Sequence, residues 1–264
     1  MFFIGERING MFKDVAEAIK KKDSAFIRQL VERQIRHGAE ALDVNVGPST
    51  ENPEEAMAWL VKTISEVSDV PLAIDTTKKE VMEIGLSLSR SRPIINSVNA
   101  NDDRLGFLFS LAKKYDASMI ALTMDKSGIP KDTEGRLELA MKIIAFAVEE
   151  GFDINRLYID PVILPVNVAQ SQIKEVLRTI KESKMLSDPP PKTILGLSNV
   201  SQGSDIKTRA LINRTFLAMA IGAGLDAAIL DVTDNELMNT AITAELLMER
   251  QLYCDSYLSA YKKR

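Results

Sequence analysis

The sequence predicts an α/β fold in which one (β/α)8 barrel spans the whole chain, residues 1–264, as a single domain. Eight short apolar segments recur along the chain, and each is followed by a polar cluster and then by a helical pattern. Apolar runs that alternate with helices are typical of a parallel sheet covered on both faces. Eight such units in about 250 residues suit a barrel. No linker or longer repeat divides the chain.

The elements follow from local patterns. We expect the strands at residues 2–4, 41–46, 72–74, 93–95, 118–122, 157–159, 193–195 and 227–230. Asn52, Pro53 and Glu55 form a helix start with a cap, a proline in the first turn and a capping glutamate. Gly38 and Gly151 each end a helical pattern, as a left-handed terminal residue does. Residues 235–261 are expected to form one long helix or two joined helices.

Composition excludes several classes of protein. The net charge is −4 and no basic stripe stands out, which argues against a nucleic-acid partner. The single cysteine, Cys254, excludes an internal disulfide framework and a cysteine-rich metal site. The apolar start is too short for a signal peptide, and the apolar stretch 217–230 is interrupted by Asp226. We therefore expect a cytoplasmic protein with no membrane span and no metal.

Polar residues follow the predicted strands, and in a parallel barrel the carboxyl ends of the strands carry the active site. This inventory consists of carboxylates and amides: Glu6, Arg7, Asn9, Asp43, Asn45, Asp75, Thr76, Asn96, Ser97, Asp160, Ser198, Asn199, Asp231 and Asp234. Cations are scarce, which argues against a bare phosphate as ligand. A 2-amino-4-oxo heterocycle suits such a rim, because its N–H groups donate to carboxylates and its carbonyl accepts from amides.

Six short motifs at these positions carry a resemblance. They are GERING at 5–10, LDVNV at 42–46, IDT at 74–76, INS at 95–97, DP at 160–161 and GLSNVS at 196–201. Their order is similar to that of the pterin-binding barrel superfamily. The chain resembles the folate domain of cobalamin-dependent methionine synthase. It resembles even more the methyltetrahydrofolate:corrinoid/iron–sulfur protein methyltransferases of the acetyl-CoA (Wood–Ljungdahl) pathway, over essentially its full length.

The resemblance implies roles for particular residues. Asp75, Asn96 and Asp160 would bind the pterin edge, and Asn199 would act in catalysis by hydrogen-bonding the methylated N5 nitrogen. The remaining substrate-binding positions that the resemblance implies are Gly196 under the ring, Ser198 and Gln202 nearby, Asn45 and Asp43 as deeper contacts, and Arg209 at the folate tail.

The resemblance also implies a partner. The methyl acceptor would be Co(I) of a corrinoid, and corrinoid domains of this superfamily carry an Asp-x-His-x-x-Gly signature. The single histidine, His37, lies in the sequence RHGA, so the signature is absent. We therefore expect no bound cofactor, methyltetrahydrofolate as substrate, and a corrinoid (cobalamin) supplied by a separate corrinoid/iron–sulfur protein. The apolar helix after strand seven predicts a homodimer through the helices that follow strands seven and eight.

Other interpretations stay open at this point. A dihydropteroate synthase would use lysine and arginine in its strand-seven motif, and residues 196–202 hold neither. A non-catalytic pterin-binding subunit would show the same rim. Asp75 and Asp160 could instead be ion-pair partners of Lys78 and Arg156. Glu6, Arg7 and Asn9 are expected to pair with one another and close the floor of the site, and Asp231 and Asp234 are expected to cap helices or tie loops.

Overall fold

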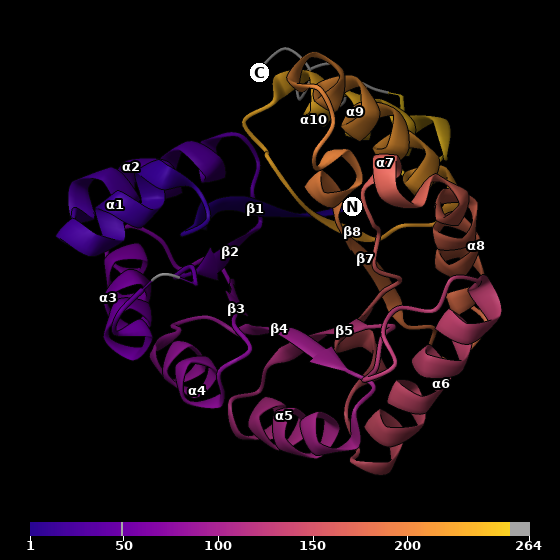
Figure 1. The fold of residues 1–264 in the computed structure, drawn as a ribbon, viewed down its shortest axis with the longest axis horizontal. Helices are drawn as coiled ribbons and strands as arrows, with labels where there is room; N and C mark the ends of the chain where they lie inside the picture. Colours follow the sequence, from indigo (N-terminus) through magenta and orange to yellow (C-terminus); the bar gives the residue numbers. More distant parts are fainter. Residues whose placement is uncertain (49, 254–264) are drawn as a thin grey trace.

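A computed structural model of the chain describes residues 1–48 and 50–253. Eight parallel strands close into a barrel in the order β1-β2-β3-β4-β5-β6-β7-β8, and helices surround it (Figure 1). The strands are β1 (Phe2–Asn9), β2 (Ala41–Asn45), β3 (Leu72–Asp75), β4 (Ile94–Asn99), β5 (Ser118–Leu122), β6 (Leu157–Asp160), β7 (Lys192–Gly196) and β8 (Ala227–Leu230). The predicted (β/α)8 barrel is confirmed.

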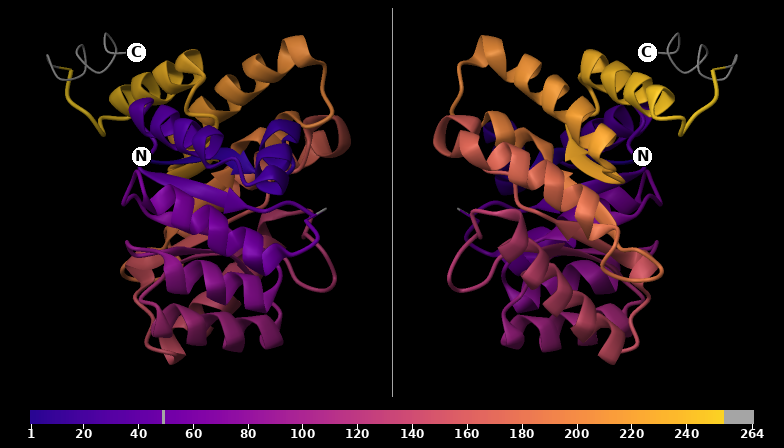
Figure 2. Two further views of the ribbon diagram at one scale, coloured as in Figure 1. Left: turned by 90° about the vertical axis from the view of Figure 1, so that its left-hand side faces the viewer. Right: turned by 90° about the vertical axis from the view of Figure 1, so that its right-hand side faces the viewer.

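The side views in Figure 2 show the helices covering the outside of the strands. The helices are α1 (Lys13–Lys21), α2 (Ser24–Arg36), α3 (Pro53–Ser65), α4 (Lys79–Leu88), α5 (Asp102–Lys114), α6 (Thr133–Glu149), α7 (Val166–Ala169), α8 (Ile173–Ser183), α9 (Ile206–Ala223) and α10 (Asn235–Leu247). Three short 3-10 turns, η1 (Ile154–Arg156), η2 (Gln170–Gln172) and η3 (Leu197–Ser201), lie between elements.

Several predicted helix ends are confirmed. The Asn52 side chain accepts a hydrogen bond from the backbone N–H of Glu55, and Pro53 opens α3. Gly38 and Gly151 both have positive φ, at 99° and 69°, after α2 and α6. Asp234 caps α10 by accepting from the N–H groups of Glu236 and Leu237.

The last helix is shorter than the sequence suggested. It ends at Leu247, and Glu249 takes a left-handed φ of 57°. The N–H of Arg250 then bonds to the carbonyl of Glu245, and the N–H of Glu249 to that of Leu246. This is the Schellman arrangement that terminates helices. The rest of the expected helical stretch, residues 254–261, lies outside the described residues.

The barrel interior is filled by one side chain from each strand. This inner layer consists of Ile4, Ala41, Ala73, Ile94, Ile120, Tyr158, Ile194 and Ala227. Strand side chains alternate between faces, so residues one step along, such as Leu42, Ile74 and Ile159, pack outward against the helices. Because alternate residues share a face, the residues two steps beyond the layer face inward again.

Candidate active site

The inward positions that follow the apolar layer are mostly polar. Two residues beyond each member of the layer lie Glu6, Asp43, Asp75, Asn96, Leu122, Asp160, Gly196 and Ile229. They stand toward the carboxyl ends of the strands, where barrel enzymes place their chemistry. The structure thus brings six of the polar or small rim residues into one layer directly above the apolar floor.

Two hydrogen bonds connect amides and carboxylates across β2, β3 and β4. The Asn45 amide donates to Asp75 over 2.7 Å, and the Asn96 amide donates to Asp43 over 2.8 Å. The Asn45 carbonyl oxygen also accepts from the N–H of Gly47. Each amide nitrogen has a second hydrogen, so Asn96 keeps a donor for a ligand while it holds Asp43.

Burial raises the pKa of both carboxyl groups above its usual value in water. Asp43 is 3% exposed. Burial raises its pKa well above the usual range, and the neighbouring Asp75 and Glu6 raise it further, against the Asn96 hydrogen bond. Burial likewise raises the pKa of Asp75, against the hydrogen bond from Asn45. Neutral amides, not cations, are the direct partners of both acids, so their charge is incompletely compensated.

Asp160 ends β6 on the other side of the barrel. It is 9% exposed, and its Oδ1 accepts the N–H of Val162 over 2.7 Å. Burial raises its pKa to about 7, although the N–H groups of Val162 and Gly196 act in the opposite direction. Arg156 does not pair with it: that guanidinium contacts Asp116 and Asp153. Asp75 accepts its hydrogen bond from Asn45. Neither acid therefore forms the ion pair, with Lys78 or Arg156, that the sequence left as an alternative.

Glu6 is a member of the site that the sequence interpretation set aside. Its carboxylate accepts a 2.8 Å hydrogen bond from Ser198, and burial together with Asp231 raises its pKa to about 7. The expected mutual pairing of Glu6, Arg7 and Asn9 is wrong. Arg7 donates to Asp14, and Asn9 accepts the N–H of Met11. The signal that could have identified Glu6 is its spacing, two residues after the inward Ile4.

The GLSNVS motif begins at the last residue of β7 and continues through η3. Gly196 faces inward, and a Cβ atom there would lie 3.1 Å from the Asn199 amide nitrogen. Asn199 is exposed, and among the described residues its side chain has no hydrogen-bond partner. Gln202, which ends the turn, is exposed as well. The turn therefore places the Asn199 amide beside Gly196 and Ser198 with its hydrogen-bonding groups available to a ligand.

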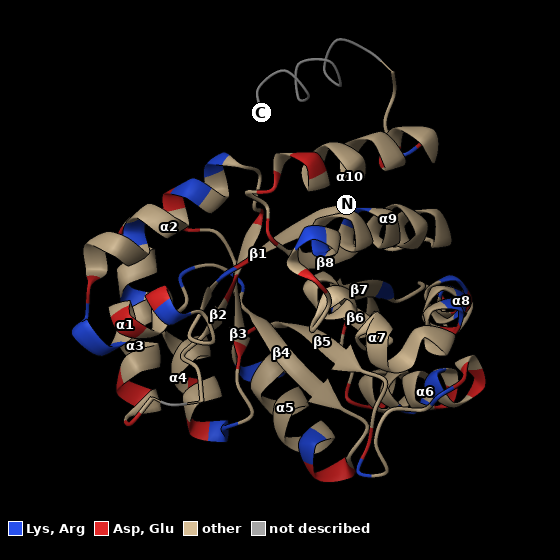
Figure 3. Cartoon of the chain, turned by 45° about the horizontal axis from the view of Figure 1, so that its top comes forward, with Lys and Arg blue, Asp and Glu red and all other residues tan. Residues whose placement is uncertain are grey.

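Arg209 lies in the first turn of α9, directly after this segment. Its side chain is exposed, and its charge lowers the pKa of Glu6. A cation close enough to act on Glu6 is close to the rim. Figure 3 shows that most other lysines and arginines lie on the outer helices.

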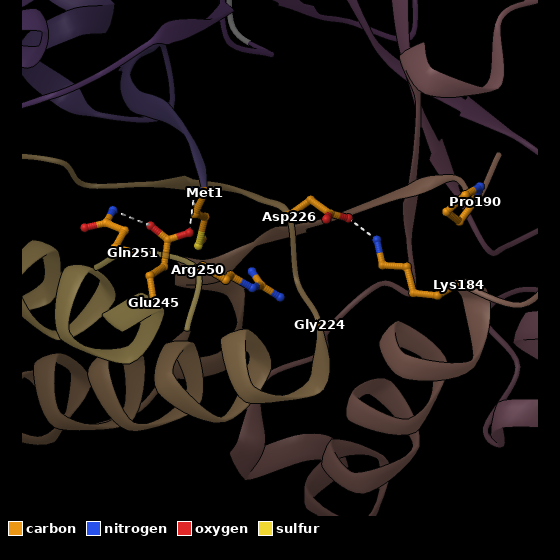
Figure 4. A pocket seen from close by; sticks show the side chains of 8 residues that line it. All are labelled: Met1, Lys184, Pro190, Gly224, Asp226, Glu245, Arg250 and Gln251. Atoms are coloured by element: carbon orange, nitrogen blue, oxygen red, sulfur yellow. Dashed lines mark hydrogen bonds and ion pairs between the residues drawn. The ribbon is translucent and has the colours of Figure 1, made fainter. Parts of the chain in front are cut away.

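A separate cavity of about 560 Å³ lies at the amino-terminal end of the barrel (Figure 4). Two ion pairs lie in it: Glu245 with the terminal amine of Met1, and Asp226 with Lys184. Arg250 donates to the carbonyls of Leu225 and Ile221. Charges that satisfy each other stabilise this end of the barrel and leave the carboxyl-terminal rim as the candidate site.

Residues 1–48 and 50–253 contain no group of three or more His, Cys, Asp and Glu side chains arranged to hold a metal ion. In the same part of the chain, no helix has both the length and the apolar character needed to cross a membrane.

The chain is similar in sequence to known proteins. The chain is 28% identical over 265 residues to “Methylcorrinoid:tetrahydrofolate methyltransferase” of Eubacterium limosum, covering 100% of this chain and 97% of the relative. It is 31% identical over 240 residues to “Methionine synthase” of Mycobacterium leprae, covering 87% of this chain and 20% of that protein. The chain thus matches about a fifth of the methionine synthase.

A solved structure, described as “Yersinia pestis DHPS with pterine-sulfa conjugate Compound 16”, superposes with a TM-score of 0.70. The alignment covers 95% of this chain and 94% of that one at 16% identity, which establishes the shared fold. The family described as “Pterin binding enzyme” matches residues 6–231. This chain therefore belongs to the pterin-binding enzyme family.

Proposed function

We propose that this chain transfers the N5-methyl group of methyltetrahydrofolate to the Co(I) corrinoid of a separate corrinoid/iron–sulfur protein, as in the acetyl-CoA (Wood–Ljungdahl) pathway. The observation that carries the proposal is the side-chain amide of Asn199. It has no hydrogen-bond partner among the described residues, and it lies beside a layer of buried acids and amides. The full-length match to a methylcorrinoid:tetrahydrofolate methyltransferase supports the reaction class. The match to methionine synthase supports it as well.

The pterin edge meets groups of matching chemistry. The exocyclic amine and ring N–H donate to the carboxylates of Asp75 and Asp160, and the remaining N–H of Asn96 donates to the ring carbonyl. Asp43 and Asn45 hold Asn96 and Asp75 in place through the hydrogen bonds described above. Gly196 leaves space for the ring to approach the backbone.

Methyl transfer requires a better leaving group than a neutral tertiary amine, because N5 would otherwise depart as an anion. Protonation of N5 removes this problem. Asn199 cannot supply the proton near neutral pH, but its amide can hydrogen-bond N5 and bind the cationic form more tightly as the reaction proceeds. Ser198, bonded to Glu6, and Gln202 flank Asn199 in this arrangement.

The proton can be held by the chain's own acids. Without ligand, Glu6 and Asp160 both have a pKa raised to about 7. Once Asp160 accepts the N–H groups of the pterin, its ionised form is favoured, and Glu6 is the acid that stays partly protonated at neutral pH. A group with a pKa near the working pH is the most effective proton donor and acceptor. The corrinoid, supplied by the partner protein, contributes the nucleophile that accepts the methyl group.

The experiment is to mix the protein with methyltetrahydrofolate and chemically reduced free cobalamin, and to follow the Co(I) absorption. Loss of that band with formation of methylcobalamin is the expected result. The reverse assay, with methylcobalamin and tetrahydrofolate, tests the direction that the name of the Eubacterium limosum relative suggests. Folate binding without transfer in either direction would contradict the proposal and indicate a non-catalytic pterin-binding subunit.

A further inference from the structure

Arg136 is a buried cation without an ion pair. It lies in the first turn of α6, and its side chain is 0% exposed. Its three nitrogens donate to neutral oxygens: Nε to the carbonyl of Pro161 at 2.9 Å, Nη1 to that of Lys131 at 3.3 Å, and Nη2 to Gln172 at 2.7 Å. Among the described residues, no carboxylate lies within salt-bridge distance of it.

Such an arrangement is unfavourable by itself. Removing a guanidinium from water costs free energy that a direct carboxylate partner would normally offset. Burial lowers the pKa of Arg136, and the more distant charges of Glu175 on α8 and Asp132 at the helix cap act against that effect only in part. A cation in the first turn of a helix also opposes the helix dipole. The free-energy cost of burying this cation must therefore be offset by the structure that its hydrogen bonds hold in place.

The contact with Pro161 points to that role. The next residue, Val162, has a φ of 61°. A β-branched residue is strained in this left-handed region, which usually admits glycine or asparagine. In this conformation the Val162 N–H is directed at the carboxylate of Asp160, at 2.7 Å.

We propose that Arg136 is a positioning residue: it anchors the carbonyl of Pro161, keeps Val162 left-handed, and so directs the Val162 N–H at Asp160. The guanidinium connects the start of α6, the loop after β6 and η2, and these three segments meet at one buried point. The consequence for catalysis rests on the proposed function, in which Asp160 binds the pterin. The consequence for Asp160 itself does not.

Titration of Asp160 tests the inference without any folate. The Asp160 carboxyl signal is followed by carbon-13 nuclear magnetic resonance and assigned by its loss in Asp160→Asn. Two backbone N–H groups, of Val162 and Gly196, oppose the rise that burial causes in the pKa of this acid. Weakening one of them in Arg136→Met should move the titration midpoint upward by roughly one pH unit. An unchanged midpoint in a folded Arg136→Met protein would overturn the inference.

Two further variants and a control keep the test decisive. Gln172→Ala removes one acceptor of the guanidinium without opening the core, and should shift the midpoint in the same direction by less. If Arg136→Met does not fold, an unchanged midpoint in Gln172→Ala overturns the inference. Arg136→Lys, which retains one donor for Pro161, should restore part of the wild-type value. The exposed Arg178→Met on α8 is the matched control and should leave the midpoint unchanged.

Binding of methyltetrahydrofolate separates the positioning role from simple core packing. Arg136→Met should raise the dissociation constant at neutral pH roughly tenfold. In a Val162→Gly background the left-handed conformation carries little strain, so the same change should cost much less affinity. An equal loss in both backgrounds would contradict positioning. If the wild-type protein binds no methyltetrahydrofolate, the proposed function fails while the titration still decides the role of Arg136.

Discussion

Buried acids with uncharged hydrogen-bond partners distinguish this site at the scale of single residues. Asp43 and Asp75 each face an asparagine, and Glu6 faces Ser198. A cation in these positions would hold the acids fully ionised and would compete with the N–H groups of a ligand. With neutral partners the pKa of each acid rises on burial. Glu6, whose pKa is raised to about 7, can exchange protons near neutral pH.

This arrangement predicts how stability depends on pH. The pKa values of Glu6 and Asp160 rise from 4.5 and 3.8 to about 7 on folding. An acid whose pKa is raised on folding stabilises the folded state while it is protonated. This contribution is lost as the pH rises from the pKa of the acid in the unfolded chain to its pKa in the folded protein. The free energy of unfolding of the ligand-free protein should therefore fall between about pH 4 and pH 7.

Asp160→Asn removes one of the titrating groups, so the fall should become shallower by up to a few kcal/mol. Urea unfolding at several pH values measures it. Glu54→Gln on the exposed surface of α3 is the control. A fall as steep in Asp160→Asn as in the wild type would show that burial does not shift this acid as described.

Asn199 yields the second prediction at this scale. Its exposed side chain makes no contact that holds the fold, so Asn199→Ala should change the free energy of unfolding by less than about 0.5 kcal/mol. Loss of one preorganised donor to the reacting nitrogen should lower methyl transfer roughly 100- to 1000-fold. Single-turnover transfer to cob(I)alamin measures this. A wild-type rate would remove Asn199 from the mechanism.

The sequence predicted the site's strand-end residues but not their pairing. Asp75, Asn96 and Asp160 follow apolar runs, and that pattern is visible without coordinates. The hydrogen bonds of Asn45 to Asp75 and of Asn96 to Asp43 depend on strand stagger, which no local pattern encodes. Val162 is a further example: nothing in its sequence context indicates left-handed backbone.

At the scale of elements, the first strand explains the error on Glu6. The sequence suggested that this strand ends at Ile4, which would make Glu6 a loop residue. In the structure β1 continues to Asn9, because Ile8 and Asn9 pair with Val44 and Asn45 of β2 after an irregularity in the register. Pairing with a neighbouring strand extended an element beyond its apolar core, and such pairing is a tertiary effect.

The β7–η3–α9 segment yields a prediction at the same scale. It places Asn199 on the 3-10 turn and Arg209 in the first turn of the next helix. We propose that Arg209 contacts the carboxylates of the folate tail. Arg209→Ala should raise the KM for methyltetrahydrofolate roughly two- to fivefold with little change in kcat, and should not affect a pterin without the tail.

Steady-state kinetics with methyltetrahydrofolate and with the pterin that lacks the tail measures the effect. Arg178→Ala on α8, which is also an exposed arginine but lies outside the rim, is the matched control. Equal losses for the two substrates would show that Arg209 acts on the pterin end and not on the tail.

At the scale of the whole molecule, large apolar side chains are exposed on α9 and at the end of α10. Leu211 and Met219 on α9 are 66% and 48% exposed, and Leu247 at the end of α10 is 76% exposed. The two helices pack against each other, and exposed apolar surface of this kind is typical of sites of protein association. We propose that a second copy of the chain covers it.

Light scattering at micromolar concentration should give about twice the chain mass of 29.2 kDa. The double variant Leu211→Glu and Met219→Glu should shift the mass toward that of one chain, because it places charges in the apolar contact. A wild-type protein that scatters as a monomer would contradict the dimer, and the proposed chemistry would stand unaffected.

The barrel interior consists of two layers of side chains. An apolar floor of one residue per strand supports a polar layer two residues further along, and η3 brings Asn199 beside it. The most direct test is a crystal structure with methyltetrahydrofolate. We expect the pterin edge against Asp75, Asn96 and Asp160, with N5 within hydrogen-bond distance of Asn199. A folate bound away from these strand ends, or an Asn199 side chain turned away from it, would contradict the account.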